Sequence, residues 1–285
     1  RLKQREASVG WPFTDAEFKD FLLSPETVQR RYALRNALMA WELLPLEAIA
    51  SQALEYLPAA ARLDAKLFPV IKPRPNSFVH GTSDDAMVFI NVDPALQTRQ
   101  IEALIVHELH HIGLFPFECV DDVRQELRAP VRRAVGLMRN FREGYAMLAA
   151  AGGPDVHPRH FDGAAARHEW DRAMAHFEAD LKAIERFLFD VIHDRLTPEQ
   201  AERLAAEFLG RQGPWYTVGW RMAATVEQYF GRALLIDSMP DPRLLLLCYN
   251  SAAVQAASDR AADRFPIWSL DLMRTLVPDR AGPAP

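Results

Sequence analysis

Apolar and polar positions divide the chain into a helical first part, a short β region and a long helical remainder. In residues 14–67, apolar side chains such as Leu34, Leu38 and Trp41 recur at helical spacing, which predicts two or three helices. A proline-rich stretch at residues 68–77 ends this pattern, because proline removes a backbone donor and disfavours helix in the residue before it. We therefore expect the helices to end at that stretch.

Residues 78–93 have the composition of a β-hairpin. Two segments flank a Gly/Ser/Asp turn, and the second, residues 86–92 (AMVFINV), is rich in β-branched and aromatic side chains. We predict a small antiparallel sheet, in which residues 86–92 form a strand with a free edge. His80, on the first arm, is interpreted as an ordinary surface or half-buried histidine rather than a ligand.

Helical periodicity resumes after the hairpin. It predicts helices over residues 98–115, 132–151, 164–193, 198–209, 215–230 and 242–259. In the third of these, Trp170, Phe177 and Leu181 share one apolar stripe, which is typical of a core helix. The predicted fold class is therefore mainly α (α+β), with one small sheet.

Composition and charge exclude some classes of function. A chain of 285 residues with 49% hydrophobic side chains can bury a substantial core, and a net charge of −5 with interspersed signs argues against a nucleic-acid partner. The apolar runs are too short for a membrane span, so we expect a soluble protein. Two cysteines, Cys119 and Cys248, are interpreted as free thiols and do not identify a redox compartment. Because the chain begins with Arg1, localisation stays open between the cytoplasm and export with the signal removed.

The segment ALIVHELHHIGLF, residues 103–115, contains the motif H-E-x-x-H at His107, Glu108 and His111. On a helix, residues four apart lie one turn apart on the same face, so both imidazoles can reach one ion while Glu108 points beside it. Chance produces this motif in roughly two per cent of chains of this composition. We predict a zinc-binding helix; the alternative is a core helix with capped or solvent-facing histidines. His110 is interpreted as a neighbour or a substrate contact.

A catalytic zinc site normally has three protein ligands and an open position. A third histidine six residues after His111 is excluded, because position 117 is Phe. The downstream glutamates are Glu118, Glu126 and Glu143. Glu118 follows Pro116 at the helix exit, and Glu126 belongs to a charged segment that we expect to be solvated.

Glu143 is the preferred third ligand. It lies on an amphipathic helix and precedes Gly144. Because Gly144 has no side chain, that helix could approach the helix of the H-E-x-x-H motif closely. The alternative is a surface acid paired with Arg139 or Arg142.

A second cluster of ligand-type side chains occupies the loop at residues 151–163. Its members are Asp155, His157, His160 and Asp162. Because proline and glycine flank them, they lack the rigid backbone of a metal site, and we interpret the loop as a solvated connection or a lid.

Three segments together give a family-level resemblance: VHELHHIGL, REGYAML, and the stretch from GPWYTVGWRM to CYN. The chain resembles uncharacterised zinc-dependent peptidases of gluzincin type, which pair an H-E-x-x-H helix with an E-G-x-A helix and a later Y-x-x-G-x-x-M segment. The resemblance covers about residues 78–250. The thermolysin-like N-E-x-x-x-D and the aminopeptidase G-A-M-E-N signatures are absent. The substrate specificity of those well-known enzymes therefore does not carry over to this chain.

The resemblance implies a zinc metallopeptidase acting on a peptide or protein. Its zincin-like lobe, with the small sheet and the H-E-x-x-H helix, would pack against a helical C-terminal lobe. We expect one catalytic domain over residues 1–285, with sub-lobes near 1–70, 71–150 and 164–260.

The implied site has a role for each residue. The Zn²⁺ ligands would be His107, His111 and Glu143. Glu108 would be the general base for a metal-activated water, and Tyr216 would assist the oxyanion, with Tyr145 as the second choice. The alternative function is a catalytically silent, helical binding module. A non-peptidase metal hydrolase is disfavoured, because no further acid cluster suits a second ion.

Overall fold

The computed structural model describes residues 12–74, 76–81, 85–118, 127–210, 212–259 and 265–277. Contacts between residues divide the chain into two units. The first comprises residues 1–55 and 59–116, and the second comprises residues 56–58 and 117–285. No described helix is long and apolar enough to cross a membrane.

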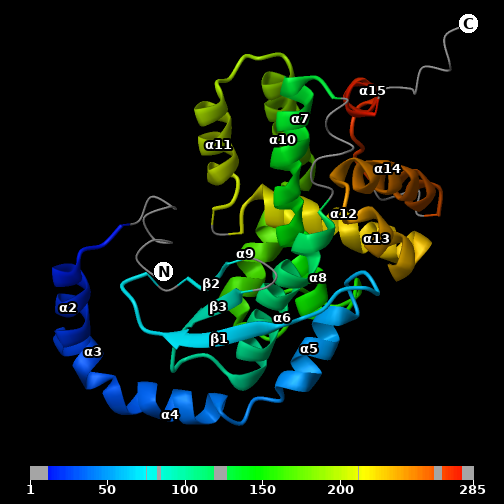
Figure 1. The fold of residues 1–285 in the computed structure, drawn as a ribbon. Helices are drawn as coiled ribbons and strands as arrows, with labels where there is room; N and C mark the ends of the chain where they lie inside the picture. The colour runs from blue at the N-terminus through cyan, green and yellow to red at the C-terminus, as the bar shows by residue number, and fades with distance from the viewer. Residues whose placement is uncertain are drawn as a thin grey trace, which may run out of the picture. The chain divides into compact units, whose positions relative to one another are not determined.

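The first unit combines helices with a small sheet (Figure 1). Its helices are α2 (Asp15–Leu23), α3 (Pro25–Gln29), α4 (Arg31–Trp41), α5 (Leu46–Leu54) and α6 (Thr98–Leu114), and its strands are β1 (Ala65–Val70), β2 (Phe78–His80) and β3 (Ala86–Asn91). The helix predicted at residues 98–115 is therefore confirmed to within one residue. The segment at 14–67 forms four helices rather than two or three, and its end already belongs to β1.

The sheet has the strand order β1-β3-β2. The predicted hairpin is confirmed, because β2 pairs with β3 antiparallel, from Phe78 opposite Phe89 to His80 opposite Met87. The sheet as a whole is mixed rather than antiparallel, since β1 pairs with β3 in parallel. The expected free edge at residues 86–92 is wrong, because β3 is the central strand. Pro69 in β1 fits an edge position, where a missing donor costs no ladder bond.

Helix α6 packs against α5 and against strands β2 and β3. Its buried face includes Ile101, Ile105, Leu109 and Ile112. A capping box between Gln97 and Gln100 fixes its first turn. The motif residues therefore stand on a helix that is held by an apolar face and has a defined start.

In the second unit, the described secondary structure consists of helices joined by turns and loops. It contains α7 (Ala129–Met138), the 3₁₀ turn η2 (Arg139–Phe141), α8 (Arg142–Ala151), α9 (Ala164–Ala175), α10 (Phe177–Ile192), α11 (Pro198–Glu207), α12 (Pro214–Phe230), α13 (Arg232–Ser238), α14 (Pro242–Asp259) and α15 (Leu270–Leu276). A further 3₁₀ turn, η1 (Phe115–Phe117), follows α6. The mainly α fold class with a small sheet is confirmed.

Two predicted helices are each divided in the structure. The helix expected at residues 132–151 is interrupted by η2, where the fully buried Phe141 packs edge-on against Trp215. The helix expected at 164–193 breaks at His176 into α9 and α10. The apolar stripe at 164–193 is nevertheless core, since Trp170 is 1% exposed. Tertiary packing thus sets breaks that helical periodicity does not reveal.

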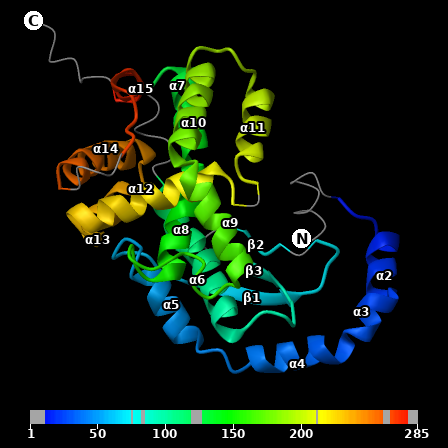
Figure 2. The same cartoon turned by 180° about the vertical axis from the view of Figure 1, so that it is seen from behind.

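Helix α12 is the centre of the second unit. It contacts α8, α10, α13 and α14, and α7 lies beside α10 (Figure 1, Figure 2). The indole of Trp215 is fully buried and donates to the carbonyl of Ala205 at 2.8 Å. Cys248 on α14 is a free, half-buried thiol, and Cys119 lies outside the described residues.

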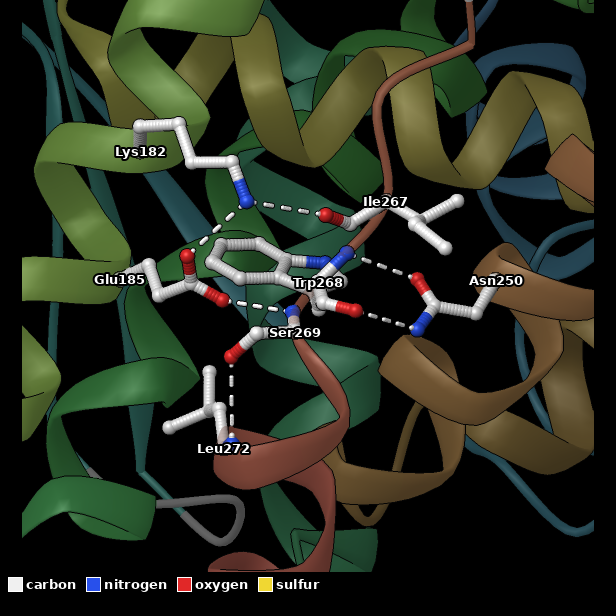
Figure 3. Close-up of polar contacts among 7 residues, drawn as sticks. All are labelled: Lys182, Glu185, Asn250, Ile267, Trp268, Ser269 and Leu272. Carbon is white, nitrogen blue, oxygen red and sulfur yellow. Dashed lines mark hydrogen bonds and ion pairs between the residues drawn. The ribbon is translucent and has the colours of Figure 1, made fainter.

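Side chains from α10 and α14 clasp the segment before α15 (Figure 3). The backbone N–H of Trp268 donates to the Asn250 amide oxygen at 3.0 Å, and the Asn250 amide nitrogen donates to the Trp268 carbonyl at 3.0 Å. Lys182 donates to the Ile267 carbonyl at 3.2 Å, and Ser269 N–H donates to Glu185 at 2.6 Å. These bonds hold the Trp268 indole fully buried.

Two opposing influences act on the pKa of Glu185. Burial, the largest single one, raises the pKa, but the hydrogen bonds from Ser269 and Lys182 outweigh it. The pKa therefore lies below its ordinary value of 4.5. The hydrogen bonds from Ser269 and Lys182 thus favour the ionised form of Glu185.

Candidate metal centre

His107 and His111 direct the same ring nitrogen toward each other across one turn of α6. Their Nε2 atoms are 3.1 Å apart, and the rings meet edge-on with centroids 4.7 Å apart. A contact this short needs at least one unprotonated Nε2, which is also the form that binds a metal. The predicted pairing of the two motif histidines is thus present within one helix.

This spacing fits a zinc ion. With Zn–N distances of about 2.0–2.1 Å, a tetrahedral site holds two nitrogen ligands about 3.3 Å apart. The observed 3.1 Å requires only a small opening of the pair. The donor set also suits zinc, since imidazole and carboxylate ligands are typical of its catalytic sites.

Glu108 and His110 share the helix with the histidine pair but are more deeply buried. Glu108 is 7% exposed, and His110 is fully buried. Burying a carboxylate costs free energy, and carboxylates that are buried despite this cost often belong to functional sites. The position of Glu108 beside His107 therefore suits a functional acid. The burial of His110 favours its interpretation as a neighbour over a role as substrate contact.

Glu143 lies half-buried in the first turn of α8. The adjacent Gly144 permits a close helix crossing, and the helix that it meets is α12. A Cβ built at Gly144 would lie 2.1 Å from the backbone carbon of Gly219 and 2.1 Å from the nitrogen of Trp220. Gly219 is the glycine of the Y-x-x-G-x-x-M segment, so the two motif glycines contact each other and fix α8 on α12.

One ligand atom from each of His107, His111 and Glu143 lies within 4.8 Å of the other two, and a group of this composition can hold a metal ion. Among the described residues, no other group of three His, Cys, Asp or Glu side chains meets this criterion.

The alternative acids are placed differently. Glu118 is 4% exposed, and its two carboxylate oxygens face Arg139 Nη1 at 3.5 Å and Arg142 Nη1 at 3.6 Å. Each of its oxygens therefore lies within ion-pair distance of one arginine. Glu126 lies outside the described residues.

The two tyrosines considered for the oxyanion differ in burial. Tyr216 is half-buried in the first turn of α12. Tyr145 is 2% exposed, and its hydroxyl finds no hydrogen-bond partner among the described residues. Burial raises the pKa of Tyr145 well above its ordinary value, and the nearby Glu118, Asp241 and Cys248 add to the shift. Tyr145 is thus a protonated core phenol, which argues against a contact with substrate.

Polar side chains of the loop at residues 151–163 pair within the loop and with residues of α9 and α12. His157 contacts Asp171 at 3.1 Å and accepts the backbone N–H of Arg159 at 3.0 Å. Arg159 also pairs with Asp162 at 3.4 Å. Asp155 accepts from Gln228 on α12 at 2.9 Å. These contacts support the interpretation of the loop as a connection.

Two features of the site escaped the sequence interpretation. One is the contact of Gly144 with Gly219, which lies 75 positions further along and for which the E-G-x-A and Y-x-x-G-x-x-M motifs were the available signal. The other is the pairing of Glu118 with Arg139 and Arg142. Nothing in the local sequence marks Glu118 as buried, because it follows an apolar turn and precedes a charged segment.

Comparison with known protein families gives a match over most of the chain. The model of one protein family matches residues 27–258, and its description reads "Putative zinc dependent peptidase (DUF5700)". No curated protein and no solved structure matches the chain. The matched range covers most of the chain and includes the motif histidines, Glu108, Glu143 and Tyr216. The chain therefore belongs to the DUF5700 family.

Proposed function

We propose that the protein hydrolyses peptide bonds as a zinc-dependent peptidase, with His107, His111 and Glu143 as the zinc ligands. The observation that carries the proposal is the convergence of the two Nε2 atoms, 3.1 Å apart on a packed helix. The carboxylate of Glu143, whose ligand atom belongs to the same group, supplies a third donor of the kind that zinc accepts. The description of the family supports the same reaction class.

A zinc ion bound there supplies a Lewis acid that lowers the pKa of water and polarises a carbonyl group. Glu108 handles the proton. Its position next to His107 suits a base that takes a proton from the attacking water and returns it to the leaving amine. Its burial, at 7% exposure, keeps bulk water from competing for that proton.

Tyr216 is proposed to donate a hydrogen bond to the carbonyl oxygen as negative charge develops there. Its position in the first turn of α12, after Pro214, places the phenol on a helix that the Gly144–Gly219 contact joins to α8. A donor aimed at the developing charge contributes more in the transition state than in the ground state. The substrate is a peptide or protein.

The decisive variant is Glu108→Gln, which keeps the size of the side chain but removes the base. We expect it to retain zinc and to lose peptide hydrolysis by about 10²- to 10⁴-fold. The matched control is Glu102→Gln on the same helix, where Glu102 pairs with Arg99 at 2.8 Å. This control should keep both zinc and activity.

The assay is cleavage of a mixed peptide library by the zinc-loaded full chain, read by mass spectrometry. Wild-type protein that binds zinc but cleaves no peptide would instead support the silent binding module. Glu108→Gln protein that cleaves at the wild-type rate would remove Glu108 from the mechanism.

A further inference from the structure

Glu118 is a buried carboxylate that the proposed chemistry does not use. It lies just after η1 and is 4% exposed. Its oxygens face the terminal nitrogens of Arg139 and Arg142 at 3.5 and 3.6 Å. Arg139 begins η2 and Arg142 begins α8, so one carboxylate spans both ends of the turn that leads into Glu143.

Burying a carboxylate is expensive, and a paired buried charge is often no more stable than an apolar replacement. Stability alone therefore gives little reason for Glu118. The charges of the two arginines give a better one. Arg139 is four residues before Glu143 on the same helical path, and Arg142 is adjacent to it. A carboxylate and an arginine four apart readily form an ion pair.

We propose that Glu118 is a positioning residue for the metal centre, which holds and neutralises Arg139 and Arg142 so that they do not compete with a metal ion for the carboxylate of Glu143. The inference rests on the proposed assignment of Glu143 as a zinc ligand. Without the Glu118 charge, the two cations, which lie four residues and one residue before Glu143 in the sequence, would be uncompensated, so they would repel a divalent ion and attract its ligand. Both effects weaken zinc binding.

The test is the zinc dissociation constant of the full chain, measured by competition with a chromophoric chelator. Glu118→Gln should weaken zinc binding about 10- to 100-fold, the usual range for residues that support metal ligands. The control is Asp190→Asn, which makes the same change in net charge at an exposed pair with Arg195. It should leave zinc affinity unchanged.

A second variant separates competition by charge from loss of packing. In Glu118→Gln/Arg139→Gln/Arg142→Gln, the competing cations are absent, so zinc affinity should return to within roughly threefold of the wild type. A triple variant as weak as Glu118→Gln would overturn the inference, because packing would then explain the loss. If Glu118→Gln yields no folded protein, the triple variant alone decides by the same criterion.

The outcomes distinguish this inference from the proposed function. Wild-type affinity in Glu118→Gln overturns only the role of Glu118. A wild-type chain that does not bind zinc contradicts the metal centre itself. Thermal unfolding of each metal-free variant shows whether a change in affinity accompanies a change in fold.

Discussion

The substitution Gly144→Ala tests how closely α8 must approach α12. The added Cβ would lie 2.1 Å from the backbone carbon of Gly219 and from the nitrogen of Trp220. Non-bonded heavy atoms rest about 3.5–4.0 Å apart, so the helices must separate by about 1.5 Å. Neither contacting atom belongs to a side chain that could rotate away.

The cost follows from two opposing effects. Overpacking of a closed contact costs about 1–3 kcal/mol, and a clash with backbone should reach the upper end of that range. Alanine is favoured over glycine inside a helix by about 1 kcal/mol, which offsets part of the cost. We therefore expect a net destabilisation of about 2 kcal/mol. Because Glu143 is adjacent, zinc affinity should fall as well.

Gly136→Ala is the matched control. Gly136 lies inside α7, and a Cβ there would meet no atom within 4 Å. Only the helix propensity changes, so this variant should gain about 1 kcal/mol. The assay is urea unfolding of the metal-free chain, followed by circular dichroism. If Gly144→Ala is as stable as Gly136→Ala, the close helix contact is refuted.

Three further outcomes are expected. Asn250→Ala removes both hydrogen bonds to the Trp268 backbone and should cost about 1–3 kcal/mol in urea unfolding; an unchanged midpoint would show that the clasp contributes nothing. The lowered pKa of Glu185 contributes stability that is present above an ordinary carboxyl pKa of 4.5 and is lost as pH falls through the folded value. Glu185→Gln should therefore flatten the loss of melting temperature on acidification, and an unaltered pH profile would contradict this. His157→Ala should keep the wild-type zinc stoichiometry, and loss of the metal would move the site to the loop at residues 151–163.

The sequence predicts helix α6 and the β2–β3 hairpin well, because both depend on the spacing and composition of residues that are close together in the chain. The spacing of His107 and His111 implies a shared helix face, and α6 has the predicted bounds within one residue. Strand β1 escaped prediction, since it is short, contains Pro69 and pairs in parallel with a strand that lies beyond a proline-rich stretch. Its presence makes β3 central and removes the expected free edge.

Long-range contacts account for the other differences. The break before α8 depends on Phe141, which packs against Trp215 and Trp268 from distant parts of the chain. The sequence predicts that Gly144 allows another helix to approach closely. Which helix approaches depends on the position of Gly219 in the folded unit. Spacing along the sequence cannot supply such a partner.

The proposed metal centre is tested most directly by the coordination of zinc in the full chain, which X-ray absorption at the zinc edge measures. With one equivalent of zinc, we predict two imidazole nitrogens and a carboxylate oxygen at about 2.0–2.2 Å. His111→Ala should remove one imidazole from the spectrum, and Glu143→Ala should remove the carboxylate. A wild-type spectrum that neither substitution alters would show that zinc binds elsewhere and would contradict the metal centre.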